Sequence, residues 1–163
     1  MNHLAHLFLA QSDINLLVGN YIADHVKGKQ IEEFSSEIQR GIQMHRGIDE
    51  FTDKHPVVIE CKERLYPKYH KYASVLIDMF FDHMLAVHWE QYHPDPLEQF
   101  SRSFYALMEK HEGILPERTI KMIPIISRYN WFVGYRSLEG LKEILYQMSQ
   151  PTRFHSELSM AVV

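Results

Sequence analysis

Apolar residues recur at spacings of three and four along most of this chain, and that periodicity limits the fold more than any other feature. The spacing is typical of α-helices that bury one face, whereas the alternation of a half-buried strand is hardly found. The sequence therefore predicts an all-α protein. No internal repeat, low-complexity tract or Gly/Ser linker divides it. Since 163 residues stand against roughly 150 per domain, we expect a single helical domain over residues 1–163.

Capping residues set the expected limits of the helices. Gly28 is a natural C-terminal stop, residues 36–39 fit a capping box, and Asp95-Pro96 suits a helix start. Residues 69–92 are expected to form the longest helix, with a broad apolar face. The expected bundle has about seven to eight helices, which cover residues 2–10, 14–27, 36–55, 56–67, 69–92, 96–111, 117–127 and 138–150.

Charge and composition exclude several classes of protein. Lys plus Arg is 17 and Asp plus Glu is 21, so the net charge of −4 argues against a nucleic-acid binder held by electrostatics. The N-terminus lacks the basic region of a signal peptide, and no apolar run is long enough to span a membrane. The single cysteine, Cys61, can form neither an internal disulfide nor a Cys-rich zinc site. We expect a cytoplasmic protein, and the sequence does not determine its oligomeric state.

The chain contains 11 histidines. At four places, aspartate or histidine residues occur within apolar segments of the sequence. His6 lies within the apolar residues 4–9, and Asp24 lies late in the second expected helix. Such side chains are rarely buried without a partner.

The other two places carry pairs at helical spacing. His45, Asp49 and Asp53 follow one another at four-residue steps, which places neighbours on one face, with Arg46 beside them. Asp78 and Asp82 have the same spacing, and His83 is adjacent. Burying two carboxylates one turn apart costs several kcal/mol unless donors or a cation compensate.

A metal ion would supply that compensation. His and Asp ligands without Cys suit a hard-to-intermediate divalent ion such as Mn²⁺ or Fe²⁺, or Mg²⁺ with fewer histidines. Such an ion lowers the pKa of bound water, and Arg46 could clamp a phosphoryl oxygen. This combination points to phosphoester hydrolysis. Each residue also has a structural explanation, a hydrogen-bonded core histidine for His6 or an ion pair of Asp49 with Arg46.

These same residues resemble a known family, the acyl carrier protein phosphodiesterases, or holo-acyl-carrier-protein hydrolases. The resemblance runs in order along nearly the whole chain. Its pieces are Met1-Asn2 with Leu4-Ala5-His6, Gly19-Asn20 with Ala23-Asp24 and Lys27-Gly28, His45-Arg46 with Ile48-Asp49 and Thr52-Asp53, Asp78 and Asp82-His83 with Leu85, and residues 131–135 with Gly140-Leu141.

The resemblance implies a fold like that of HD-type metal phosphohydrolases, usually active with manganese. It also implies hydrolysis of the phosphodiester between a carrier-protein serine and 4'-phosphopantetheine. The residues carried over as metal ligands are His6, Asp24, His45, Asp49, Asp82 and His83, and the catalytic set is Asp24, His45, Arg46 and Asp49.

The chain departs from the family pattern at several points. His3 stands at a usually aromatic position and is not counted as a ligand, and Asp82-His83 reverses the HD order. His70-Lys71 replaces expected arginines. Family members continue through a further helix beyond the position of Val163, so the prediction is a helical domain without that helix.

Three hypotheses for function remain. The first is a manganese-dependent phosphodiesterase of holo acyl carrier protein, an acidic partner that would dock on Lys27, Lys29, Arg40 and Arg46. The second keeps the metal site for a nucleotide or another small phosphoester. The third is a non-catalytic helical module whose His and Asp residues form a buried network.

Overall fold

Every described element of this protein is helical, so the prediction of an all-α fold is confirmed. The structure, a computed structural model, describes residues 2–10, 13–149 and 157–162. None of the helices in these ranges combines the length and hydropathy that a membrane crossing requires. The α-helices are α1 (His3–Ala10), α2 (Ile14–Ile22), α3 (Ser36–Lys54), α4 (Pro56–Tyr69), α5 (Ala73–Val87), α6 (Trp89–Tyr92), α7 (Leu97–Lys110), α8 (Glu117–Arg128), α9 (Trp131–Gly134) and α10 (Leu138–Ser149). The 3-10 segments are η1 (Ala23–His25), η2 (Gly28–Glu33), η3 (His70–Tyr72), η4 (Glu112–Ile114) and η5 (Glu157–Val162).

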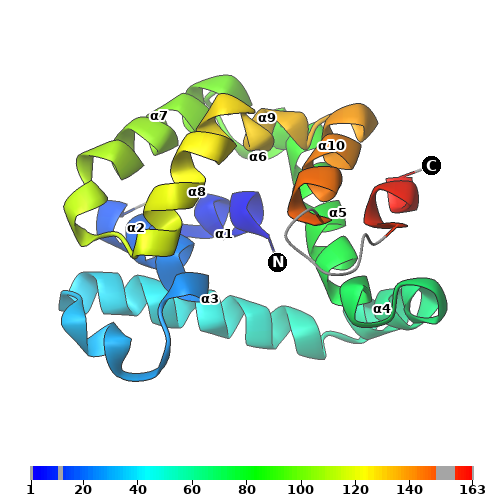
Figure 1. Ribbon diagram of the computed structural model, residues 1–163, viewed down its shortest axis with the longest axis horizontal. Coiled ribbons are helices and arrows are strands. Elements are labelled where there is room, and N and C mark those ends of the chain that lie inside the picture. The colour runs from blue at the N-terminus through cyan, green and yellow to red at the C-terminus, as the bar shows by residue number, and fades with distance from the viewer. Residues whose placement is uncertain (1, 11–12, 150–156, 163) are drawn as a thin grey trace.

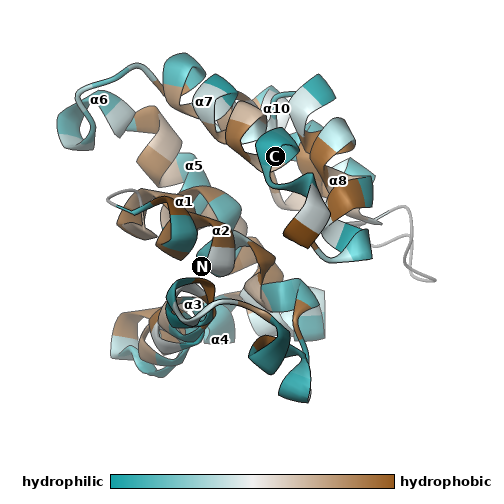
Figure 2. Ribbon diagram, turned by 90° about the vertical axis from the view of Figure 1, so that its left-hand side faces the viewer, coloured by the Kyte–Doolittle hydropathy of each residue, from teal (hydrophilic) through white to brown (hydrophobic). Residues whose placement is uncertain are grey.

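The apolar helices α1 and α2 lie in the middle of the bundle (Figures 1 and 2). Helices α3 and α4 lie on one side of them, and α7, α8 and α10 lie on the other. The buried side chains form one cluster that joins these layers, from Leu4 and Leu7 in α1 through Met79 in α5 to Phe132 in α9. One cluster is what a single domain requires; one domain over residues 1–163 stays a prediction.

Helices α2 and α3 pack backbone against backbone. A Cβ atom on Gly19 would lie 2.1 Å from the Ile38 carbonyl oxygen, and one on Gly41 would lie 2.4 Å from the Leu16 carbonyl oxygen. Any side chain at either position would push the helices apart. This close approach sets α2 directly beside the face of α3 that carries His45.

The helix expected over residues 14–27 ends earlier. Asp13 caps its start by accepting hydrogen bonds from the amides of Asn15 and Leu16. The α-helix stops at Ile22, tightens into η1, and gives way to extended backbone at Val26. His25 Nδ1 lies 2.7 Å from the Thr119 hydroxyl, a tertiary contact that holds this turn.

The helix expected over residues 69–92 is broken twice, so α3, with 19 residues, is the longest instead. His70, the first residue of η3, has a positive φ of 48° and ends α4, and His88 separates α5 from α6. Neither break carries a proline or glycine that would have predicted it. The capping residue of α3 is Ser35 rather than Ser36.

Candidate metal centre

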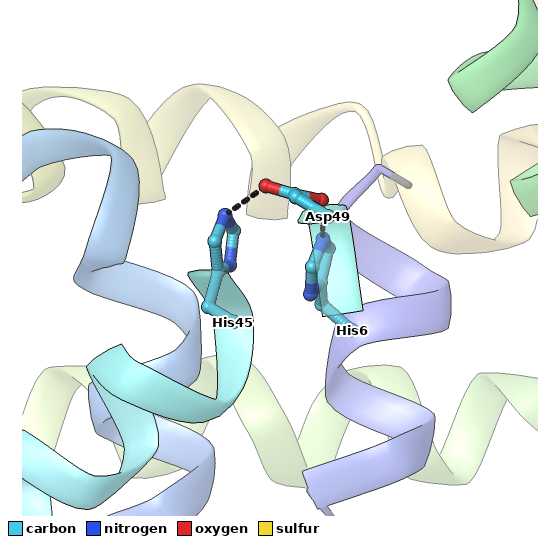
Figure 3. A group of neighbouring side chains, drawn as sticks. All are labelled: His6, His45 and Asp49. Atoms are coloured by element: carbon cyan, nitrogen blue, oxygen red, sulfur yellow. Dashed lines mark hydrogen bonds and ion pairs between the residues drawn. The ribbon is translucent and has the colours of Figure 1, made fainter. Parts of the chain in front are cut away.

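Two histidines from different helices meet at one carboxylate. His6 of α1 and His45 and Asp49 of α3 each offer one ligand atom, and these atoms all lie within 4.8 Å of one another. His6 Nε2 donates to Asp49 Oδ1 at 3.0 Å, and His45 Nε2 donates to Asp49 Oδ2 at 3.1 Å. Figure 3 shows both rings pointing at this carboxylate. The i, i+4 spacing on α3 and the packing of α1 against α3 produce the group.

Asp24 joins the group from η1. Its Oδ1 lies 3.3 Å from His45 Nε2, so two carboxylates converge on one imidazole nitrogen. The Asp24 side chain is 61% exposed, whereas His6 and His45 are buried. The group therefore has buried imidazole rings and an opening toward solvent at Asp24.

Asn20 orients the His45 ring from behind. The Nδ1 atom of His45 donates to the Asn20 side-chain oxygen at 3.1 Å, which leaves Nε2 facing the carboxylates. Asn20 is fully buried on α2. A hydrogen bond at the second ring nitrogen is how proteins orient histidines that ligate metals.

The electrostatics of the group favour positive charge beside its two carboxylates. Burial alone would lower the pKa of His45, but hydrogen bonds to Asp24 and Asp49 outweigh burial and raise this pKa to about 9. The hydrogen bond from His45 lowers the pKa of Asp24 to about 2. Burial opposes ionisation of Asp49, yet hydrogen bonds from His45 and His6 hold its pKa far below the usual range. Both carboxylates are thus ionised and attract positive charge.

The donor set fits a divalent metal ion. Imidazole nitrogens and carboxylate oxygens are ligands for Mn²⁺, Fe²⁺ and Zn²⁺. The ligand atoms already converge, and Asn20 supplies the outer hydrogen bond that such sites contain. These residues therefore form a possible metal-binding centre.

The structure does not bring Asp82 and His83 into this group. Asp82 is fully buried, and its two oxygens accept hydrogen bonds from the Leu4 and Ala5 amides at 2.8 and 2.9 Å. These amides lie in the first turn of α1, where the helix offers them no partner, and they supply the hydrogen-bond donors that a buried carboxylate requires. His83 Nδ1 donates to the Tyr135 carbonyl at 2.6 Å. A ligand role for either residue stays a prediction.

Arg46 and His3 lie at the edges of the group. Arg46 is exposed, and its Nη2 donates to the Val26 carbonyl at 3.1 Å, so it reaches toward the segment after η1. His3 lies beside Tyr21, with ring centroids 5.3 Å apart, and burial lowers its pKa to about 4. Phosphate binding by Arg46 stays a prediction.

Asn20 is the site residue that we did not predict from the sequence. It stands four residues before Asp24, a spacing that places both on one face of a helix. That spacing was the available signal. An asparagine side chain neither titrates nor commonly ligates such a metal, and the partner of Asn20, His45, is 25 residues away in the sequence.

Comparison with known proteins identifies the family. A family model described as acyl carrier protein phosphodiesterase matches residues 1–163. The chain belongs to the acyl carrier protein phosphodiesterase family. A protein of that name from Photorhabdus laumondii is 33% identical over 160 residues, 98% of this chain and 79% of the relative. One from Escherichia coli O45:K1 is 37% identical over 153 residues, 91% of this chain and 78% of the relative.

The resemblance stated from the sequence motifs is thereby confirmed. No solved structure shows a significant match to this phosphodiesterase-family chain. The HD-like part of the fold prediction therefore stays a prediction, while the all-α part stands.

Proposed function

We propose that this protein is a divalent-metal phosphodiesterase that hydrolyses the link between 4'-phosphopantetheine and the serine of a holo acyl carrier protein. The observation that carries the proposal is the convergence of His6, His45 and Asp49 in a chain that the family model matches from end to end. The two relatives whose names state this activity are similar in sequence to this chain over most of its length and most of their own.

The proposed ligands are His6, His45 and Asp49, with Asp24 at the open side. Asp82 and His83 are left out because their side chains bind the α1 amides and the Tyr135 carbonyl. Mn²⁺ is the proposed metal, since a mixed His/Asp set suits it, with Fe²⁺ and Mg²⁺ as the other candidates. A bound divalent ion supplies Lewis acidity that activates water and polarises a phosphoryl oxygen.

The chain's own residues bind and orient the reactants. Asp24, the more exposed of the two carboxylates at His45, would accept a hydrogen bond from the attacking water. Arg46, which donates a hydrogen bond to the Val26 carbonyl near the turn that follows Asp24, would bind a phosphoryl oxygen. The water oxygen bonds to phosphorus, the bond from phosphorus to the serine oxygen breaks, and that oxygen leaves with a proton from the water. The products are apo carrier protein and 4'-phosphopantetheine.

Docking of the acidic carrier is proposed on Lys27, Lys29, Arg40 and Arg46, all of them exposed. Lys29 lies in η2 and Arg40 and Arg46 lie on α3, two elements in contact. In a chain of net charge −4, such a local patch is needed to steer an acidic partner.

The test is a mass measurement. Purified protein with Mn²⁺ is incubated with holo carrier protein, and we expect the carrier to lose the mass of 4'-phosphopantetheine. Asp49→Asn should reduce the rate by at least about a hundredfold, since it weakens metal binding and removes a charge. Chelation before the reaction should stop it.

Parallel reactions separate the proposal from its alternatives. Turnover of nucleotides with no loss of mass from the carrier would favour a small-phosphoester hydrolase. Absence of bound metal together with absence of turnover would favour a partner-binding module.

A further inference from the structure

A cavity of about 570 Å³ lies beside the metal centre. Its walls come from the turn after Asp24, from the junction of η2 and α3, and from the loop between η4 and α8. Apolar groups of Val26, Phe34, Ile38 and Leu115 alternate with polar groups such as that of Gln30. A concave, mainly apolar pocket with a few polar groups is typical of a small-molecule site.

Two short links join this cavity to the metal centre. His25 and Val26 in its wall directly follow Asp24 in the chain. The Val26 carbonyl also accepts the hydrogen bond from Arg46, the residue after His45. The hydrogen bond to Thr119 holds the His25 ring in this wall.

Helix α3 contributes a residue to both the cavity and the metal centre, so the distance between the two sites follows from helix geometry. Ile38 in the cavity wall and His45 in the metal centre are seven residues apart, two turns on the same face. At 1.5 Å per residue the two positions lie about 10 Å apart along the helix axis.

Resting on the proposed function, we propose that this cavity binds the pantetheine arm of the substrate while the phosphodiester lies at His6, His45 and Asp49. Pantetheine consists of three units joined by two amides, with about twelve backbone bonds from its terminal hydroxyl oxygen to its sulfur, the length of about four residues. At about 3.5 Å per residue the extended arm measures about 14 Å, which is long enough to reach from the metal centre into the cavity. Its amides suit the polar groups of the wall, and its methyl groups and thiol end suit the apolar ones. The enzyme thereby recognises the prosthetic group as well as the carrier.

Gly113 allows the cavity to be filled without disturbing the core. It lines the cavity, and a Cβ added there would have no atom within 4 Å. Gly113→Phe should therefore place a ring in the cavity. The matched control is Gly47→Phe, since Gly47 is equally open but lines a different hollow, with Glu50 and Phe51. Ile114→Trp provides a second filling variant in case the first does not fold.

Binding is measured first, with pantetheine alone and by NMR titration of the full chain. We expect the wild type and Gly47→Phe to bind pantetheine and Gly113→Phe to bind it at least about tenfold more weakly. On holo carrier protein, Gly113→Phe should raise KM by a similar factor and leave kcat within about twofold, because it removes ground-state binding of the arm.

The outcomes separate this inference from the proposed function. No pantetheine binding by the wild type, or equal binding by Gly113→Phe, would overturn the inference even if the carrier is hydrolysed. A higher KM with unchanged pantetheine binding would also overturn it, because the cavity would then contact the carrier protein instead. If the wild type binds pantetheine in this cavity but releases no apo carrier, the proposed function fails and the binding site stands.

Discussion

The imidazole rings of His6 and His45 are stacked, with centroids 3.8 Å apart and planes inclined by 11°. The stack keeps both Nε2 atoms on the same side, so the two oxygens of Asp49 receive one hydrogen bond from each ring. Two parallel imidazoles held 39 residues apart in sequence act as one preformed unit. A preformed set of donors lowers the ordering cost of binding an ion.

Replacing either histidine should abolish tight metal binding. Loss of a residue that hydrogen-bonds a metal ligand typically weakens metal binding by about 10–100-fold. We expect His6→Ala and His45→Ala, which remove a ligand itself, to weaken Mn²⁺ binding by more than this. Calorimetric titration of the metal-free protein gives the measurement. His55→Asn is the control, because His55 is exposed and an asparagine can still cap α4. Unchanged binding in both alanine variants would exclude this centre.

Asn20 should act through His45 rather than on the substrate. Asn20→Leu removes the acceptor for His45 Nδ1, so the affinity for Mn²⁺ should fall about 10–100-fold. Asn20→Asp keeps an acceptor oxygen and should recover most of this loss. The free energy of unfolding, measured on the metal-free proteins, separates a positioning role from a general loss of structure. If the two variants bound metal equally, the hydrogen bond would have no such role.

The close packing of α2 against α3 should make Gly41 intolerant of any side chain. Gly41→Ala would place a Cβ 2.4 Å from the Leu16 carbonyl oxygen, and we expect destabilisation of about 1–3 kcal/mol or more. On the same helix, Gly47→Ala meets no atom within 4 Å and should stabilise the protein by up to about 1 kcal/mol. Urea denaturation of both variants gives the comparison. Equal effects would contradict the packing seen between Gly19 and Gly41.

The buried carboxyl of Asp82 should make stability depend on pH. Burial raises its pKa from 3.8 to about 7, against the opposing effect of the Ala5 and Leu4 amides. A pKa that is higher in the folded state gives a stabilising contribution below about pH 4, which is lost as the pH rises through 7. Relative to Asp82→Asn, the wild type should therefore lose stability over this interval. Denaturation of both metal-free proteins between pH 4 and 8 measures this difference. A wild type that gains stability instead would show that the α1 amides outweigh burial.

Local signals determined much of the fold. The spacing of apolar residues predicted the helical class, and the starts of α2, α3, α4 and α8 lie within one residue of their expected positions. Helix propensity and capping act over one or two turns, so such features can be read from sequence. The same local logic paired His45 with Asp49 on one face of α3. It missed the breaks at His70 and His88, which have no local signal.

Tertiary packing alone decided which polar residues share a site. His6 and Asp24 precede His45 by 39 and 21 residues in the sequence. They lie near His45 because α1 and η1 pack against α3. Asp82, another aspartate that stands among apolar residues in the sequence, lies instead on the amides at the start of α1. From sequence, a buried carboxylate needs compensation, and a metal or a helix N-terminus meets that need equally well. Only the arrangement of the helices determines which of the two each aspartate receives.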